Sequence, residues 1–92
     1  MSKYNVITNN DGELTHQIIE SNNKLTDVCR NAYDKLIQTY KDDDDEFILT
    51  DEWENTELES KPAFASMGAT IDYEMGHEYR YDVSVKVEKI AG

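Results

Sequence analysis

Carboxylates are the most concentrated chemical group in this chain. Residues 42–59 read DDDDEFILTDEWENTELE, which places ten carboxylates in eighteen residues with no Lys or Arg among them. The formal net charge of the whole chain is −11, so this segment holds most of the excess. Oxygen ligands and negative charge at this density fit three interpretations: a divalent-cation site, a solvated acidic surface, or a surface that imitates a polyanion.

A calcium loop of the EF-hand type is the first interpretation to examine. Such a loop needs oxygen ligands at alternate positions, a Gly at the sixth position and a bidentate Glu at the twelfth. If the loop began at Asp42, its sixth residue would be Phe47 and its twelfth Trp53, and no other starting point repairs the pattern. The sequence therefore predicts no specific metal site and no cofactor.

Residues suited to catalysis are scarce. His16 and His77 are the only histidines, and no Ser or Cys lies in a recognisable nucleophile motif. Cys29 is the single cysteine and falls among apolar residues, which favours burial as a small hydrophobe over reactivity. A divalent-metal-dependent hydrolase remains an alternative, but the sequence favours a protein that is not an enzyme and has no catalytic residues.

The charge balance argues against direct contact with nucleic acid or with an anionic membrane. The chain has 20 Asp and Glu against nine scattered Lys and Arg, whereas a nucleic-acid surface must be basic. The opening MSKYNVITNN lacks the apolar core of a signal peptide, and no segment approaches membrane-spanning length. A single cysteine excludes an intramolecular disulfide and fits a reducing compartment. We therefore expect a soluble cytoplasmic protein.

Residues 11–40 are predicted to form one long amphipathic helix. At about 100° per residue, the apolar residues of this segment fall in one stripe. They are Leu14, Ile18, Leu25, Cys29, Ala32, Tyr33, Leu36 and Tyr40. The pair Asn22–Asn23 is the weakest point, because Asn favours local side-chain bonds over helix, and two shorter helices are the alternative. The unbroken phase of the stripe favours a single helix.

Four acidic residues recur every seven positions on the opposite side of this predicted helix, about 10 Å apart. They are Glu13, Glu20, Asp27 and Asp34. Any amphipathic helix needs a charged outer face, but an ordinary one intersperses Lys and Arg with its acids, and this column does not. The column also points toward Asp42. The pattern thus predicts an acidic surface that continues from the helix into the acidic segment.

After residue 46 the hydrophobic period changes from 3.6 to 2, which predicts strands. The first strand covers residues 47–53, a loop covers 54–63, and two further strands cover 64–74 and 78–88. Residues 5–7 can add a short edge strand. The predicted fold is therefore a single α+β domain, residues 1–92, in which one long N-terminal helix packs on a three- to four-stranded antiparallel meander.

The register of the last two predicted strands follows from their alternation. A three-residue loop at Met75-Gly76-His77 pairs Ile71 with Tyr81 and Ala69 with Val83, and it also sets Asp72 opposite Arg80. A two-residue loop would place apolar residues opposite polar ones. The apolar face of this hairpin is expected to pack on the stripe of the helix.

Imitation of DNA is the interpretation that uses the acidic pattern most fully. Duplex DNA carries one negative charge per ~1.7 Å of axis, and proteins bind it largely through its phosphates. Carboxylates in rows on a rigid fold could engage the same Lys and Arg. The alternative is a small acidic adaptor that binds a basic protein partner without competing for DNA. The candidate partner-binding residues are Glu13, Glu20, Asp27, Asp34, Asp42, Asp43, Asp44, Asp45, Glu46, Asp51, Glu52, Glu54, Glu57 and Glu59.

Over its full length the chain resembles the anti-restriction nuclease (Arn) proteins of T-even bacteriophages, which are small acidic DNA mimics. The resemblance rests on the size, the opening NVITNN, the segment LTDVCRNAYDKLI and the acidic segment that follows. It implies a phage protein in the host cytoplasm that occupies the DNA-binding surfaces of the restriction complex McrBC and, as a second target, of the nucleoid protein H-NS.

The same resemblance implies a homodimer. Tyr4, Trp53 and an open edge of the sheet are the candidate dimer contacts. No pattern of individual residues is transferred from the family, so the candidate partner-binding residues come from charge geometry alone.

Overall fold

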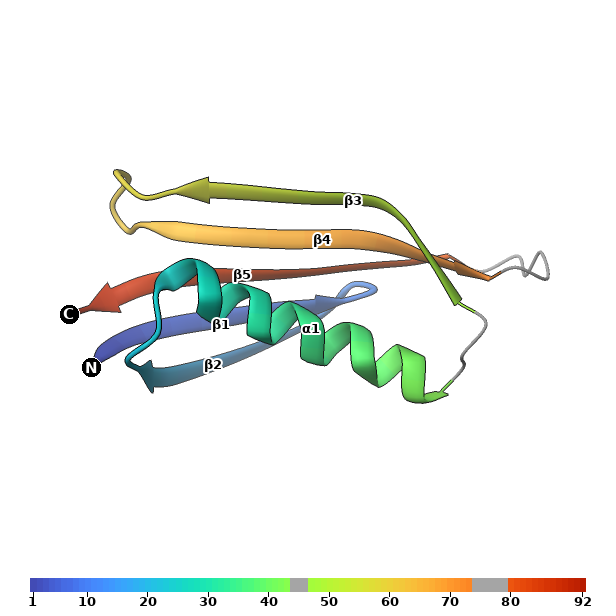
Figure 1. Ribbon diagram of the computed structural model, residues 1–92, viewed down its shortest axis with the longest axis horizontal. Helices are drawn as coiled ribbons and strands as arrows, with labels where there is room; N and C mark the ends of the chain where they lie inside the picture. The colour runs from blue at the N-terminus through green and yellow to red at the C-terminus, as the bar shows by residue number, and fades with distance from the viewer. Residues whose placement is uncertain (44–46, 74–79) are drawn as a thin grey trace.

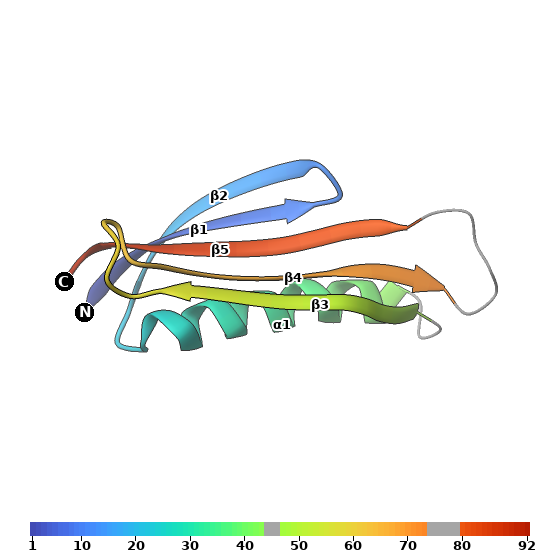
Figure 2. The same cartoon turned by 90° about the horizontal axis from the view of Figure 1, so that it is seen from above.

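The computed structural model describes residues 1–43, 47–73 and 80–92. Its elements are, in chain order, β1 (Ser2–Asn10), β2 (Glu13–Ser21), α1 (Leu25–Asp43), β3 (Phe47–Glu57), β4 (Phe64–Tyr73) and β5 (Tyr81–Ala91). The strands form one antiparallel sheet in the order β2-β1-β5-β4-β3. The helix lies along one face of this sheet and leaves the other face uncovered (Figures 1 and 2).

The predicted fold, a long N-terminal helix on a meander, is wrong. The fold is mostly β, and its single described helix lies in the middle of the chain. Residues 13–21, predicted as helix, form β2. Leu14 and Ile18 misled the prediction because a spacing of four fits both a helix face and one face of a strand.

A turn signal that favours the hairpin was overlooked. Asp11-Gly12 joins β1 to β2, and both residues have positive φ, 53° and 90°. A two-residue hairpin loop of type I′ requires positive φ at both positions, and Asp-Gly is among its preferred sequences. The short edge strand predicted at residues 5–7 is part of β1, which is longer than expected. Because β2 pairs with it on one side and β5 on the other, β1 lies inside the sheet rather than at an edge.

The helix begins just after Asn22–Asn23, the pair at which the predicted long helix could have been divided into two shorter helices. Its periodicity from Leu25 onward is as predicted: Leu25, Cys29 and Leu36 are buried against the sheet. The Tyr4 hydroxyl donates a hydrogen bond to the Asn23 carbonyl oxygen at 2.7 Å and so ties the start of α1 to β1. Tyr4 is 2% exposed, which makes it a core residue and not a candidate dimer contact.

The three C-terminal strands agree more closely with the sequence. Ile71 pairs with Tyr81 and Ala69 with Val83, which confirms the predicted register. Arg80 Nε lies 3.2 Å from Asp72 Oδ2, which confirms the predicted cross-strand pair. The loop predicted for residues 54–63 is partly wrong, because β3 continues to Glu57 past a register shift between Thr50 and Trp53. The predicted turn at residues 75–77 lies outside the described residues.

The core lies between α1 and the middle of the sheet. Val85, Val87 and Ile71 have no exposed surface, and α1 packs mainly on β4 and β5. The edge strands receive little cover, since every residue of 51–57 on β3 and of 13–18 on β2 is exposed. No helix in the described part of the chain is long and apolar enough to span a membrane.

Replacing Ile71 by Ala is expected to lower the free energy of unfolding by about 2–5 kcal/mol, because the removed atoms leave a cavity in the core. Ile90 provides the control, since it is 52% exposed on β5. Its replacement by Ala should cost less than about 0.5 kcal/mol. Urea unfolding followed by circular dichroism measures both. Equal losses would mean that the core does not lie where the fold places it.

Candidate functional site

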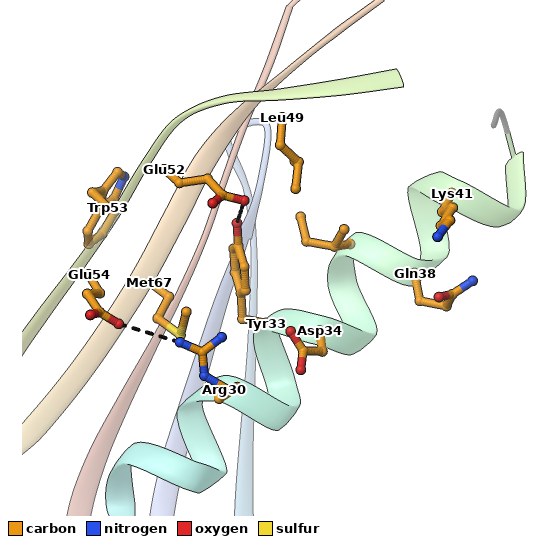
Figure 3. A pocket seen from close by; sticks show the side chains of 11 residues that line it. Arg30, Tyr33, Asp34, Gln38, Lys41, Leu49, Glu52, Trp53, Glu54 and Met67 are labelled. Atoms are coloured by element: carbon orange, nitrogen blue, oxygen red, sulfur yellow. Dashed lines mark hydrogen bonds and ion pairs between the residues drawn. The ribbon is translucent and has the colours of Figure 1, made fainter. Parts of the chain in front are cut away.

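A groove with a volume of about 590 Å³ runs between α1 and β3. The helix contributes Arg30, Tyr33, Asp34, Ile37, Gln38 and Lys41 to its lining, β3 contributes Leu49, Glu52, Trp53 and Glu54, and β4 contributes Met67 (Figure 3). The groove exists because β3 lies at the sheet edge, beyond the strands on which α1 packs. Its position allows side chains of both elements to face the same partner.

Exposed carboxylates follow both elements that form the groove. The α1 row consists of Asp27, Asp34 and Asp42, and the β3 row consists of Asp51, Glu52, Glu54 and Glu57. At 1.5 Å per helical residue the α1 row is about 22 Å long. At ~3.3 Å per strand residue the β3 row is about 20 Å long. The two rows thus have similar lengths and lie on elements that run in opposite directions along the molecule (Figure 1).

The groove also contains cations, contrary to the expectation of a purely acidic surface. Arg30 Nη2 lies 3.6 Å from Glu54 Oε2, and Lys41 is part of the lining. Both side chains of the Arg30–Glu54 pair are more than half exposed, so the pair contributes little to stability. It does connect α1 to the edge strand.

A second connection between α1 and β3 is made by Tyr33. Its hydroxyl donates a hydrogen bond to Glu52 Oε1 at 3.5 Å (Figure 3). Burial of the ring, followed by the negative charge of Glu52, raises the pKa of Tyr33 to about 12. The phenol is therefore neutral at physiological pH and keeps its proton for the Glu52 carboxylate, whose side chain it orients toward the groove.

Cys29 is buried in the core, which confirms the expectation that it acts as a small hydrophobe. Its Sγ is 3.9 Å from the Val85 carbonyl oxygen, to which the thiol donates a weak hydrogen bond. Burial raises the pKa of Cys29 to about 11. Because the thiolate is the reactive species, the thiol is protected from chemistry at neutral pH.

The predicted acidic residues do not form one continuous surface. Glu13 and Glu20 lie on β2 at the opposite edge of the sheet, where Glu20 Oε1 is 4.0 Å from Lys3 Nζ. The predicted four-residue column is therefore wrong, and only Asp27 and Asp34 share α1.

The described part of the acidic segment is divided among α1, β3 and the connection between β3 and β4. Asp42 lies in α1 and accepts a hydrogen bond from Gln38 Nε2 at 2.8 Å, whereas Asp43 ends the helix. Asp44, Asp45 and Glu46 lie outside the described residues. Glu59 is exposed in the connection between β3 and β4. Of the predicted residues, the fold brings Asp34, Glu52 and Glu54 together at the groove, and the other members of the two rows lie along the same two elements.

Arg30 and Tyr33 are the site residues that the sequence analysis missed. With Asp34, Ile37 and Lys41 they follow the spacing i, i+3, i+4, i+7 and i+11, which is one face of a helix. This helix face could be read from the sequence. The strand that it contacts was predicted only as far as residue 53, whereas β3 continues to Glu57.

Within the described residues, no three or more His, Cys, Asp or Glu side chains are grouped so that they could hold a metal ion. No protein-family model, curated protein or solved structure matches the chain. The geometry of the groove and its charges is therefore the main basis for a functional proposal.

The Tyr33–Glu52 contact predicts a pH effect on stability. The folded-state pKa lies above the usual value of 10.0, so ionisation of Tyr33 opposes folding. Its stabilising contribution is complete below pH 10 and is lost as the pH rises toward 12. Urea unfolding between pH 9 and 11.5 should show a steeper loss of stability for the natural protein than for Tyr33→Phe. Parallel curves would show that Tyr33 ionises equally well in the folded and unfolded chains.

Proposed function

We propose that this protein is a non-enzymatic DNA mimic that occupies the DNA-binding surfaces of basic proteins. The pair of carboxylate rows along α1 and β3 is the observation that carries the proposal. Seven carboxylates over about 22 Å correspond to one per ~3 Å, compared with one phosphate charge per ~1.7 Å of duplex axis. The rows thus reach roughly half the charge density of DNA before Arg30 and Lys41 are counted.

The shape of the molecule supports this proposal. Its principal extents are 46 × 22 × 19 Å, so it is long and narrow, and both rows follow the long axis (Figure 1). At 3.4 Å per base pair, 46 Å corresponds to about 13 base pairs of duplex. The carboxylates sit on a helix and a paired strand, so little ordering is needed when a partner binds.

An acidic adaptor that binds a basic protein without competing for DNA is the alternative. Both functions use the same charges, and they differ in whether the DNA-binding surface of the partner is occupied. Two rows of matched length on rigid elements favour the mimic, because an adaptor for a flexible basic tail needs no fixed spacing. A competition experiment with duplex DNA separates the two.

As targets we propose the restriction complex McrBC and, as a second target, the nucleoid protein H-NS, with the host cytoplasm as the site of action. The sequence resemblance to the Arn family motivates this choice. The α1 and β3 rows supply a physical basis, since such proteins hold DNA through Lys and Arg that would accept carboxylates in place of phosphates.

We also propose that two copies pair through the free edge of β2. Natural edge strands are commonly blunted by Lys, Pro or bulges. β2 has no Lys or Pro, it pairs with β1 over nine residues without a register shift, and it exposes Leu14 and Ile18. The β3 edge carries four acids, which would repel a second copy. Pairing through β2 would leave the acidic rows at both ends of a continuous sheet.

This pairing predicts that Ile18→Lys converts a dimer into a monomer, because the lysine would place a positive charge on the edge strand where the second copy pairs. Ile48→Lys is the matched control, since Ile48 is 40% exposed on the opposite edge strand and should leave the dimer intact. Sedimentation velocity measures the mass of each. A natural protein that remains monomeric at ~100 μM would exclude the β2 pairing without affecting the DNA-mimic proposal.

The central test of the function is displacement of DNA. Fluorescence anisotropy of a labelled duplex bound to a sequence-independent DNA-binding protein should fall as the natural protein is added. Neutralising Asp27→Asn, Asp34→Asn and Glu57→Gln together should weaken this competition roughly tenfold, because each exposed charge pair is worth about 0.5 kcal/mol.

The control removes the same number of charges from elsewhere. Glu13→Gln, Glu20→Gln and Glu88→Gln together lie on β2 and β5, away from the rows, and should weaken competition by less than about threefold. Equal losses for the two triple variants would mean that net charge alone matters. Binding of the partner without any release of DNA would favour the adaptor.

A further inference from the structure

A smaller hollow lies on the face of the sheet that α1 leaves uncovered, with a volume of about 200 Å³. The residues that line it are Asn9, Asp51, Trp53, Thr70, Asp82 and Ser84, together with Ala69 and Val83. Because successive residues of a strand point to opposite faces, Thr70, Asp82 and Ser84 face away from their buried neighbours Ile71, Val83 and Val85. We call this hollow the Trp53 pocket.

Trp53 forms an aromatic wall of the pocket. It pairs with Gly68 on β4, and a Cβ at Gly68 would lie only 2.5 Å from atoms of the indole. The missing side chain at Gly68 therefore lets the indole lie directly against the sheet, which restricts its rotamers. Trp53 as a residue still has 47% of its surface exposed. A large aromatic surface is thus held in place and open to solvent.

Carboxylates complete the pocket beside this ring. Asp82 Oδ1 accepts a hydrogen bond from Thr70 Oγ1 at 3.1 Å, which orients it. Asp51, which also belongs to the β3 row, is the second carboxylate of the lining. Asp11 adds a third close by, since its Oδ1 accepts a hydrogen bond from the Asp82 backbone N–H at 3.3 Å. Of the described residues, none of those lining the pocket is Lys or Arg. Arg80 lies near in sequence but is paired with Asp72.

We propose that the Trp53 pocket receives an arginine side chain of the basic partner. A guanidinium is planar and weakly hydrated, stacks on Trp, and offers five N–H donors that suit carboxylates. The lysine ammonium is compact and strongly hydrated, so it gains less from an aromatic surface. The inference rests on the proposed function for the identity of the partner as a basic protein, and it adds a preference for arginine over lysine.

The pocket and the carboxylate rows have different roles in this account. The rows attract any cationic side chain through long-range charge, which discriminates little between Lys and Arg. The Trp53 pocket discriminates between Arg and Lys, because the indole stacks on a guanidinium while a carboxylate accepts hydrogen bonds from the same group. DNA-binding proteins present Arg to both phosphates and guanine, so a preference for arginine selects their surfaces among basic proteins.

Nona-arginine and nona-lysine peptides test the preference with equal charge. Trp53 is the only Trp in the chain, so intrinsic fluorescence reports directly on the pocket. Nona-arginine should bind roughly three- to tenfold more tightly by calorimetry and should quench or shift the Trp53 emission. Nona-lysine should bind with a smaller change in fluorescence. Equal affinities and equal fluorescence changes would overturn the proposal.

Two sets of variants locate the preference. Trp53→Leu should reduce the ratio of the two affinities to about one while leaving nona-lysine binding within about twofold, because no charge is altered. Asp51→Asn with Asp82→Asn keeps the fluorophore and should reduce nona-arginine binding more than Glu57→Gln with Glu59→Gln, which removes two charges outside the pocket. Equal losses from the two pairs would contradict the pocket even if the Trp53 variant failed to fold.

Failure of this inference is distinguishable from failure of the proposed function. If the natural protein displaces duplex DNA from its partner but shows no arginine preference, the rows act alone and the pocket is wrong. If arginine is preferred but DNA stays bound, the pocket is real and the mimic is wrong.

Discussion

The layout of this molecule follows from the difference in width between one helix and a five-stranded sheet. A helix with its side chains is about 10 Å across, whereas neighbouring strands are ~4.8 Å apart, so α1 can cover only two or three strands. It packs mainly on β4 and β5, where Ile71, Val85 and Val87 have no exposed surface. The two edge strands, one on each side, receive little cover from it.

This arrangement explains why charge collects on β3. A strand that is solvated on both faces and on its free edge has no apolar face to preserve, so carboxylates at almost any position keep their water. Residues 51–57 are all exposed and include four acids. The Tyr33–Glu52 and Arg30–Glu54 contacts then tie this strand to α1. Self-repulsion among the acids is the cost of a surface that suits a basic partner.

The sequence predicted the parts of the fold in which one face is buried. The β4–β5 register could be read because apolar and polar residues alternate there, and Asp72 opposite Arg80 supported it. β2 could not be read in this way, since its residues 13–18 are exposed on both faces and Leu14 and Ile18 fit either period. The Asp11-Gly12 turn was the one local signal that favoured a hairpin over a helix.

The candidate site was predictable in composition and not in arrangement. Asp27, Asp34 and the acids of β3 were identified from charge alone. Glu13 and Glu20 were predicted beside them because residues 13–21 were predicted as helix, whereas they form β2. Arg30, Tyr33 and Gly68 acquire their roles only through tertiary contacts: an ion pair, a hydrogen bond and the place of the Trp53 ring. Such contacts depend on a register shift in β3 that no periodicity encodes.

The central claim is that the α1 and β3 rows contact the surface by which a partner holds DNA. Backbone amide chemical shifts of the labelled protein, recorded with a saturating DNA-binding protein, would map the contact directly. The account predicts shifts at Asp27, Asp34, Glu52, Glu54 and their neighbours, and their disappearance when excess duplex DNA is added. Shifts confined to β2, or shifts along the rows that persist in excess DNA, would contradict it.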